Sequence, residues 1–388
     1  MSRTVSVQKI LADLVAIPSV HPEADSGGTT PGEAAMAQHV AETLRRLGAE
    51  VRLHALAPGR SSVVAVFEPS GQPAATVALV PHLDTVGVDG MTVPPFQLTR
   101  RGTRLQGRGA CDTKGPMAAL LAALSVWAQS RRRLASRTRW IFAATAGEEQ
   151  GSLGAEALMK EGFSADFAVA LEPTQLRVVS AAKGLLRLWI DVPGRAAHGA
   201  TPERGRNAVF AALPLLAELR DQVAPALAAR VHPVLGRASL NLGIVAAGSG
   251  LNVVPANCRL GLDLRLHPGC EAREALHLVR AAIATHAPGA RLSLHREGPS
   301  FVTERTLPWA RTLRRVGRGW ATADWFCDGN VFASRIPSVA FGPGRIEQAH
   351  TRDEFIEESE LEAGVGAFRR LLDEESAAPP RRIKSLKS

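Results

Sequence analysis

Cysteines and long apolar runs are both scarce in this chain of 388 residues. The four cysteines lie far apart and match neither a zinc-knuckle spacing nor a disulfide framework: they are Cys111, Cys258, Cys270 and Cys327. No apolar run is long enough to span a bilayer, and residues 1–14 show no signal-peptide pattern. We therefore expect a cytoplasmic protein with reduced cysteines and no membrane partner.

Several common functional signatures are also absent. The sequence contains no P-loop, no dinucleotide-binding glycine fingerprint, no Gly-x-Ser-x-Gly elbow and no internal repeat. A formal net charge of +9 is compatible with nucleic-acid binding, but the basic residues are spread along the chain. Their local clusters, residues 131–133 and 381–387, fall in an expected loop and in the tail. We expect no nucleic-acid partner.

The composition is that of a folded protein, with 45% hydrophobic and 21% charged residues. The chain is too long for one ordinary core, so two domains are expected. In the first half, apolar runs typical of buried strands alternate with helical patterns, which predicts an α/β domain with a mostly parallel sheet. The expected strands are 63–67, 76–80, 139–144 and 167–171, and the expected helices are 115–129 and 153–160.

From residue 184 the pattern changes to strand, helix, two strands, helix and strand, over 185–192, 207–219, 238–245, 257–266, 271–285 and 290–295. This βαββαβ order is typical of a ferredoxin-like domain. We predict that 184–295 is inserted into a larger domain formed by 1–183 and 296–372, which ends with a strand at 338–341 and a helix at 360–372. The tail, 373–388, is rich in alanine, proline and basic residues and is expected to be disordered.

Acidic and histidine side chains stand where predicted strands end, which is where open parallel sheets bind ligands. His82 closes one strand, and Asp84, two residues later, can orient an imidazole that binds a metal. Asp112 lies among glycines directly before an apolar helix. Taken alone, His82 is compatible with a structural histidine and Asp112 with a helix N-cap.

Glu148 and Glu149 follow the next strand. Adjacent carboxylates repel unless a cation or a shared proton separates them, which raises one pKa. One glutamate can therefore bind a metal while the other acts as a general base. Glu172 follows a further strand, and His350 follows a glycine-rich loop; either residue alone is typical of a solvated loop.

Together these residues form a set of nitrogen and oxygen ligands without thiolate, which suits Zn²⁺, Co²⁺ or Mn²⁺. A charge count favours two ions. Two dications bring four positive charges, Asp112, Glu149 and Glu172 bring three negative charges, and a hydroxide brings the fourth. Such a site would be neutral.

The five segments, in this order, resemble the M20 metallopeptidase family over roughly residues 5–372. Residues 342–354 are most similar to the acetylornithine deacetylase branch, although Pro81 and the lack of tryptophan in 88–96 depart from the family pattern. The resemblance implies a zinc-peptidase-like catalytic domain with two metal ions per subunit. The implied roles are as follows: Asp112 bridges the ions, His82 and Glu172 bind one, Glu149 and His350 bind the other, Asp84 orients His82, and Glu148 is the general base.

The inserted domain also resembles that of the family, where it serves as a lid and dimerisation domain. Residues 194–202 resemble the lid motif, whose histidine, here His198, reaches the other subunit's active site and stabilises the tetrahedral oxyanion. Asn252 and Arg265 resemble positions that bind the substrate carboxylate, a task suited to a guanidinium group. Gly342 and Gly344 are assigned to substrate binding with them. The resemblance thus implies a homodimer.

The implied activity is metal-dependent removal of an acyl group from an N-acyl amino acid, in amino-acid biosynthesis. Three alternatives remain open. The same chemistry serves a dipeptidase or carboxypeptidase and a succinyl-diaminopimelate desuccinylase, and a non-catalytic binding module is the third.

Overall fold

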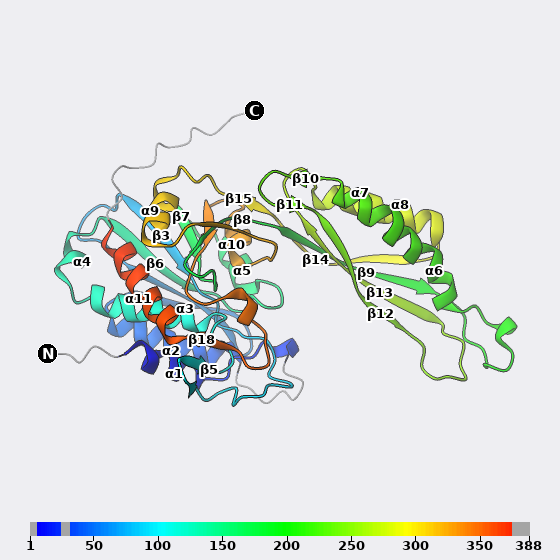
Figure 1. Cartoon of the computed structure of the whole chain (residues 1–388), viewed down its shortest axis with the longest axis horizontal. Coiled ribbons are helices and arrows are strands. Elements are labelled where there is room, and N and C mark those ends of the chain that lie inside the picture. Colours follow the sequence, from blue (N-terminus) through cyan, green and yellow to red (C-terminus); the bar gives the residue numbers. More distant parts are fainter. Residues whose placement is uncertain (1–5, 25–31, 375–388) are drawn as a thin grey trace. The chain divides into compact units, whose positions relative to one another are not determined.

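A computed structural model describes residues 6–24 and 32–374 (Figure 1). The chain divides into two compact units. The first takes the residues up to Ser180, Thr303–Ala321 and those from Cys327 onward, and the second takes Ala181–Val302 and Thr322–Phe326. These bounds lie a few residues from the predicted 184–295, and the short return at 322–326 was not anticipated. Of the predicted tail, all but residues 373 and 374 lies outside the described part of the chain.

The first unit is built on one mixed sheet, in which the order is β1-β2-β6-β3-β7-β17-β8. The inner pairs β6–β3, β3–β7 and β7–β17 are parallel, whereas β1–β2, β2–β6 and β17–β8 are antiparallel. The bounds are Glu50–Ala57 (β1), Arg60–Phe67 (β2), Ala75–Val80 (β3), Thr138–Ala144 (β6), Phe167–Ala170 (β7), Val178–Ala182 (β8) and Ser338–Ala340 (β17). The predicted α/β class is confirmed, and the sheet is parallel across its central strands β6, β3, β7 and β17.

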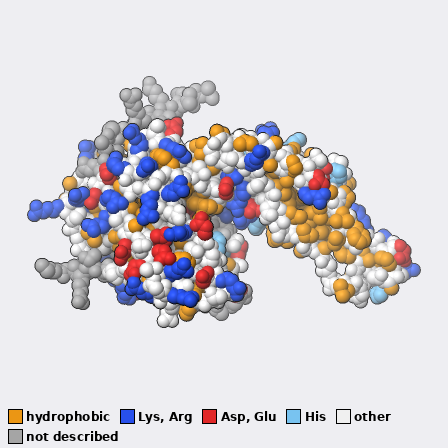
Figure 2. Space-filling view, in the orientation of Figure 1, with side chains coloured by type: hydrophobic (Ala, Val, Ile, Leu, Met, Phe, Trp, Pro, Cys, Tyr) orange, Lys and Arg blue, Asp and Glu red, His pale blue; other side chains and the backbone are white. Residues whose placement is uncertain are grey.

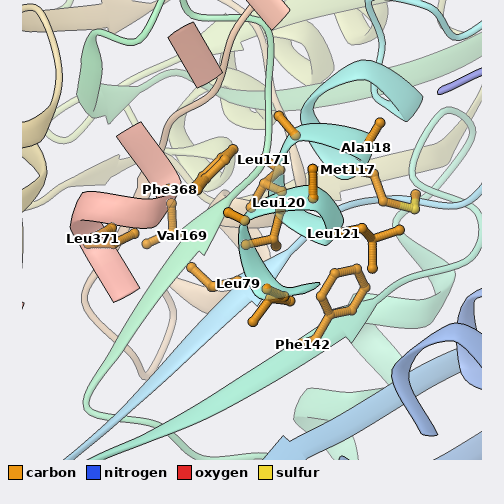
Figure 3. Close-up of a cluster of buried hydrophobic side chains, with 14 of the residues drawn as sticks. Leu79, Met117, Ala118, Leu120, Leu121, Phe142, Val169, Leu171, Phe368 and Leu371 are labelled. Carbon is orange, nitrogen blue, oxygen red and sulfur yellow. The ribbon is translucent and has the colours of Figure 1, made fainter. Parts of the chain in front are cut away.

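Helices pack against this sheet and are held by its apolar side chains. Helix α3 is buried over nearly its whole length, as expected of a helix that is apolar on all sides. Figure 3 shows Leu120 and Leu121 of α3 among side chains of the sheet and of α11. The helices are α1 (Val7–Val15), α2 (Glu33–Arg46), α3 (Lys114–Trp127), α4 (Arg131–Ala135), α5 (Leu153–Lys160), α9 (Pro308–Val316), α10 (Asp328–Phe332) and α11 (Glu358–Asp373).

The remaining strands of the first unit and of the chain crossings between the units are short. In the first unit, β4 (Thr99–Arg101), β5 (Arg104–Gln106) and β18 (Phe355–Glu357) form a small antiparallel sheet. At the junctions between the units, β15 (Phe301–Val302) and β16 (Trp320–Ala323) pair with β8.

The second unit has the predicted βαββαβ order. Its four long strands form an antiparallel sheet in the order β12-β13-β9-β14, with the first and third strands at the centre, as in ferredoxin-like domains. The elements are β9 (Gly184–Pro193), α6 (Ala208–Glu218), α7 (Ala224–Ala228), β12 (Ser239–Ala247), β13 (Asn257–Leu266), α8 (Ala272–His286) and β14 (Arg291–Gly298), with a small hairpin of β10 (Val231–His232) and β11 (Gly236–Arg237).

Candidate metal centre

Three of the predicted metal-binding segments leave adjacent strands at one edge of the sheet. His82 follows β3, Glu148 and Glu149 follow β6, and Glu172 follows β7, and these strands run parallel in the order β6-β3-β7. Because parallel strands end at the same edge, their loops converge there. The sheet therefore brings together residues that are up to 90 positions apart in the sequence.

Asp112 lies between two imidazoles. Its Oδ1 is 2.9 Å from Nε2 of His82 and its Oδ2 is 3.3 Å from Nε2 of His350. Nε2 of His350 is also 3.0 Å from Oε2 of Glu149. Ligand atoms of His82, Asp112 and Glu149 all lie within 4.8 Å of one another. One carboxylate thus faces two imidazoles with separate oxygens, which is the arrangement that a bridging ligand requires.

Asp84 supports this group in two ways. The Nδ1 atom of His82 is 3.0 Å from the backbone oxygen of Asp84 and 3.6 Å from its carboxylate. The carboxylate accepts hydrogen bonds from the backbone N–H groups of Gly147, Glu148 and Glu149, at 3.0–3.1 Å. Asp84 therefore fixes both the His82 ring and the turn that carries the two glutamates.

The loop before α3 is held by Glu354, whose role the sequence did not indicate. Asp112 is not the N-cap of α3, a position that Thr113 takes. Instead, the buried Glu354 carboxylate accepts hydrogen bonds from the backbone N–H groups of Gly109, Cys111 and Asp112, all at 2.9 Å, and from Arg108 at 2.8 Å. Glu354 thus connects the His350 segment to the loop that presents Asp112.

The glycines before His350 hold a second pair of loops together. The backbone N–H of Leu176 donates to the oxygen of Gly342, and that of Gln175 donates to Gly344, both at 2.8 Å. A Cβ atom at Gly342 would lie 2.7 Å from the backbone oxygen of Glu172, so this close approach needs glycine. The two glycines therefore pack against the Glu172 loop.

The electrostatics of the site favour bound positive charge. Hydrogen bonds to Asp112 and Glu149 raise the pKa of His350 to about 11. Burial opposes protonation of His82, but Asp112 and Asp84 still hold its pKa well above its usual value. Burial and neighbouring carboxylates raise the pKa of Glu148, Glu149 and Glu172. All of these shifts favour the protonated forms, so the carboxylates of the site attract positive charge.

Metal cations fit the same donors. The Oε1 atom of Glu149 is buried and has no hydrogen-bond partner among the described residues, although buried carboxylate oxygens are almost always paired. The donors are imidazole nitrogens and carboxylate oxygens, which bind zinc and related ions. His82, Asp112, Glu149, Glu172 and His350 would hold such ions.

Comparison with known proteins supports this interpretation. The profile of "Peptidase family M20/M25/M40" matches residues 78–374, which is more than half of the chain. The chain belongs to this family. It is a hydrolase of the metallopeptidase type, and the resemblance of its motifs to M20 is confirmed.

Curated relatives and solved structures agree with this membership. The chain is 29% identical to an acetylornithine deacetylase of Proteus mirabilis (strain HI4320), over 91% of this chain and 92% of the relative. It is 31% identical to an acetylornithine deacetylase of Myxococcus xanthus, over 77% and 80% of the two chains. Its fold is similar to that of an M20 family metallo-carboxypeptidase from Sulfolobus solfataricus, with a TM-score of 0.82, 16% identity and coverage of 95% and 99%.

A second group near the M20 centre involves a histidine that the sequence did not single out. Ligand atoms of His21, Glu33 and Asp84 lie within 4.8 Å of one another. Both oxygens of Glu33 accept hydrogen bonds from Arg60, at 2.7–3.1 Å, and Asp84 is engaged by backbone N–H groups. These carboxylates already have cationic or N–H partners, so the group is better suited to fixing Asp84 than to holding a metal.

In the second unit, the predicted residues form two separate sets. The backbone N–H of Gly199 donates to the oxygen of Asn252 at 2.7 Å, and His198 pairs with Val253 in an isolated bridge. Arg265 lies near the other end of β13, where it contacts Asp263 at 3.0 Å. The structure thus places His198 beside Asn252, whereas Arg265 lies elsewhere in the unit.

None of the helices in residues 6–24 and 32–374 has the length and apolar character of a membrane span.

Proposed function

We propose that the protein removes the acyl group from the nitrogen of an N-acyl amino acid, as an acetylornithine deacetylase does. The observation that carries this proposal is that the two oxygens of Asp112 face the imidazoles of His82 and His350, while Glu149 contacts His350. Two curated relatives that cover 91% and 77% of the chain are acetylornithine deacetylases, which supports the choice of an acyl-amino acid over other amides.

We assign two divalent ions to this site, with Zn²⁺ as the first candidate and Co²⁺ or Mn²⁺ as alternatives. Asp112 would contact both ions, with His82 and Glu172 on one side and Glu149 and His350 on the other. When bound, such ions polarise a carbonyl group and lower the pKa of water.

Glu148 is suited to the role of general base. Its backbone is fixed by the Asp84 carboxylate at 3.0 Å, and burial, together with Glu172 and Asp328, raises its pKa well above the usual value. A carboxylate with a raised pKa can accept a proton from the attacking water and then return it to the leaving amine. His198 is assigned to the oxyanion, where such a contact contributes about 3–4 kcal/mol.

The positions of the second-unit residues support a homodimer in which this unit is the lid and dimerisation domain. Along β13, Arg265 lies eight positions after Asn257, the end that adjoins the His198 segment. At about 3.3 Å per residue this is about 26 Å, which is longer than an acyl-amino acid. If both Arg265 and His198 contact one substrate, two chains must supply them.

The surface of the second unit is compatible with such an association. Strand β12 is at the edge of its sheet and exposes Leu242, Ile244 and Val245. Figure 2 shows hydrophobic side chains gathered on this unit. An unpaired edge strand with exposed apolar side chains favours pairing with a second chain.

Complementation tests the shared site. Glu148→Gln and His198→Ala variants are each expected to be nearly inactive. If they are mixed and allowed to exchange subunits, half of the dimers carry one site with both intact residues, so about a quarter of the wild-type activity should return. Failure to recover activity, when subunit exchange is verified with differently tagged chains, would refute the shared site.

A substrate panel tests the activity. Initial rates on N-acetyl-ornithine, other N-acyl amino acids including N-succinyl-diaminopimelate, and dipeptides should be highest for N-acetyl amino acids. The fold is similar to that of a metallo-carboxypeptidase, so activity restricted to dipeptides would support that second candidate. Metal binding without hydrolysis of any of these would favour the binding-module alternative.

A further inference from the structure

The Glu148–Glu149 turn is fixed by a third carboxylate outside the predicted metal ligands. Asp328 is the first residue of α10 and its side chain is buried, with a residue exposure of 2%. It lies 183 positions from Thr145 in the sequence, yet the Thr145 hydroxyl donates a hydrogen bond to its Oδ2 at 2.5 Å. A hydrogen bond also joins Asp328 to the Ser152 side chain.

Thr145 and Ser152 are the two ends of this turn. Thr145 follows β6, and its backbone pairs with the His82 segment through Leu83 N–H at 2.7 Å and the Pro81 oxygen at 3.0 Å. Ser152 is the N-cap of α5 and has a positive φ of 50°, a conformation that non-glycine residues adopt when surrounding contacts hold them. Asp328 therefore contacts the residue where the turn begins and the residue where it ends.

The middle of the turn is held from elsewhere, by a different carboxylate. Asp84 accepts hydrogen bonds from the backbone N–H groups of Gly147, Glu148 and Glu149. Between the two carboxylates, the turn has its ends fixed by side-chain hydroxyls and its centre fixed by backbone N–H groups. The side chains of Glu148 and Glu149 are thus left to face the metal centre.

Stability alone does not explain a carboxylate at position 328. Burying a charge is unfavourable unless it is well paired, and Oδ1 of Asp328 has no hydrogen-bond partner among the described residues. An aspartate in the first turn of a helix is commonly stabilised by the dipole of that helix. Helix α10, however, has five residues. The hydrogen bonds described for the Asp328 carboxylate run instead to Thr145 and Ser152 of the turn.

We propose that Asp328 is a positioning residue that holds the Thr145–Ser152 turn so that Glu148 and Glu149 face the metal centre. The catalytic part of this inference rests on the proposed amide hydrolysis, whereas the positioning part concerns the turn itself. Accurate placement of a base is worth large factors in rate, because small displacements of a reacting group are costly.

The first test uses the metal-free protein, so that it depends neither on metal nor on substrate. Amide hydrogen exchange of Gly147, Glu148 and Glu149 should be at least about 10-fold faster in Asp328→Ala than in the wild type, because the turn opens more often. Asp328→Asn, which keeps the shape and an acceptor oxygen, should exchange within about 3-fold of the wild type. Thr145→Val removes the same hydrogen bond by removing its donor, the Thr145 hydroxyl. If Asp328→Ala does not fold, the exchange rates of Thr145→Val provide the test.

Ser334→Ala is the matched control. The Ser334 hydroxyl donates a hydrogen bond to the backbone oxygen of Val331 in α10 at 2.7 Å, so this change perturbs the end of the same helix at a hydrogen bond that stays within the segment. Equal acceleration of the three amides in this control, or slow exchange in both Asp328→Ala and Thr145→Val, would overturn the proposal.

Kinetics of the metal-loaded enzyme form the second test. Asp328→Ala should lower kcat by about 100-fold with KM changed less than 3-fold, because the base is displaced and the substrate-binding residues are not. Asp328→Asn should recover kcat to within about 10-fold of the wild type. An Asn variant as slow as the Ala variant would refute positioning by hydrogen bonds. A wild type that hydrolyses none of the substrates would refute the proposed function, while the exchange result would still decide the role of Asp328.

Discussion

Metal binding to this site should release protons, and the number follows from the surroundings of the two imidazoles. At pH 7 His350 is protonated, because hydrogen bonds to Asp112 and Glu149 raise its pKa to about 11. We expect His82 to be protonated as well, since Asp112 and Asp84 outweigh its burial and raise its pKa. In both rings the Nε2 atom that faces Asp112 is the atom available to a metal. A ligating imidazole must be neutral, so both protons must leave.

We therefore expect release of about two protons when both metal positions fill at pH 7, and more if raised-pKa carboxylates also lose protons. Each proton released makes the binding constant rise about 10-fold per pH unit, so two protons give about 100-fold. Isothermal titration calorimetry with Zn²⁺, in buffers of different ionisation enthalpy, gives the proton count from the slope of the observed enthalpy.

Two variants make this measurement specific. His350→Ala should release about one proton fewer than the wild type. His54→Ala is the control, because His54 contacts Glu161 at 3.0 Å and not the metal ligands, so it should leave the count unchanged. A count near zero at pH 7 in the wild type would show that the imidazoles are already neutral and that the electrostatic account of the site is wrong.

Four further changes have defined outcomes. Glu148→Gln should keep metal binding by elemental analysis but lower kcat by about 10²–10⁴, since it removes proton transfer; near-normal turnover would refute the role. Arg60→Met leaves the fully buried Glu33 carboxylate without its partner and should lower the free energy of unfolding by about 3–5 kcal/mol, much of which a second Glu33→Leu change should restore; equal losses in the single and double variants would contradict this. Gln175→Gly should raise the free energy of unfolding by up to about 1 kcal/mol in denaturant titrations, because Gln175 has a φ of 57°; a loss above that size would show that its side chain matters more than its backbone. The Tm of the metal-free protein should fall as pH rises from about 6.5 towards 11, because groups with raised folded-state pKa values stabilise the protein while protonated; a constant Tm would contradict the raised values.

Much of the fold could be predicted from apolar periodicity. The predicted helix at 153–160 and strand at 257–266 coincide with α5 and β13, because each has an apolar pattern of one clear period. Helix α2 was not predicted, although Met36, Val40 and Leu44 are buried at helical spacing. Helix α10 has five residues, too few to give a periodic signal. Its place is set by packing against α5, β7 and β17.

The residue types of the candidate site could be predicted because they follow strands that converge at one edge. The residues that support the site could not be predicted in the same way. Glu354 and Asp328 act on segments 242 and 183 positions away, and no local pattern encodes such contacts. The separation of Arg265 from His198 likewise depends on strand register, which the sequence pattern leaves open. The assigned roles of the ligands, Glu148, His198 and the second unit remain predictions.

The most direct test of the account is to titrate Zn²⁺ or Co²⁺ into the chelator-treated protein while the release of free amine from N-acetyl-ornithine is measured. We predict that the rate is negligible without metal, rises with added metal, stops rising at about two ions per chain, and is abolished again by chelator. A rate that is unaffected by chelator would contradict the central claim that these residues form a hydrolytic metal centre. Metal binding that is unchanged by substitution of His82, Asp112 or Glu149 would contradict it as well.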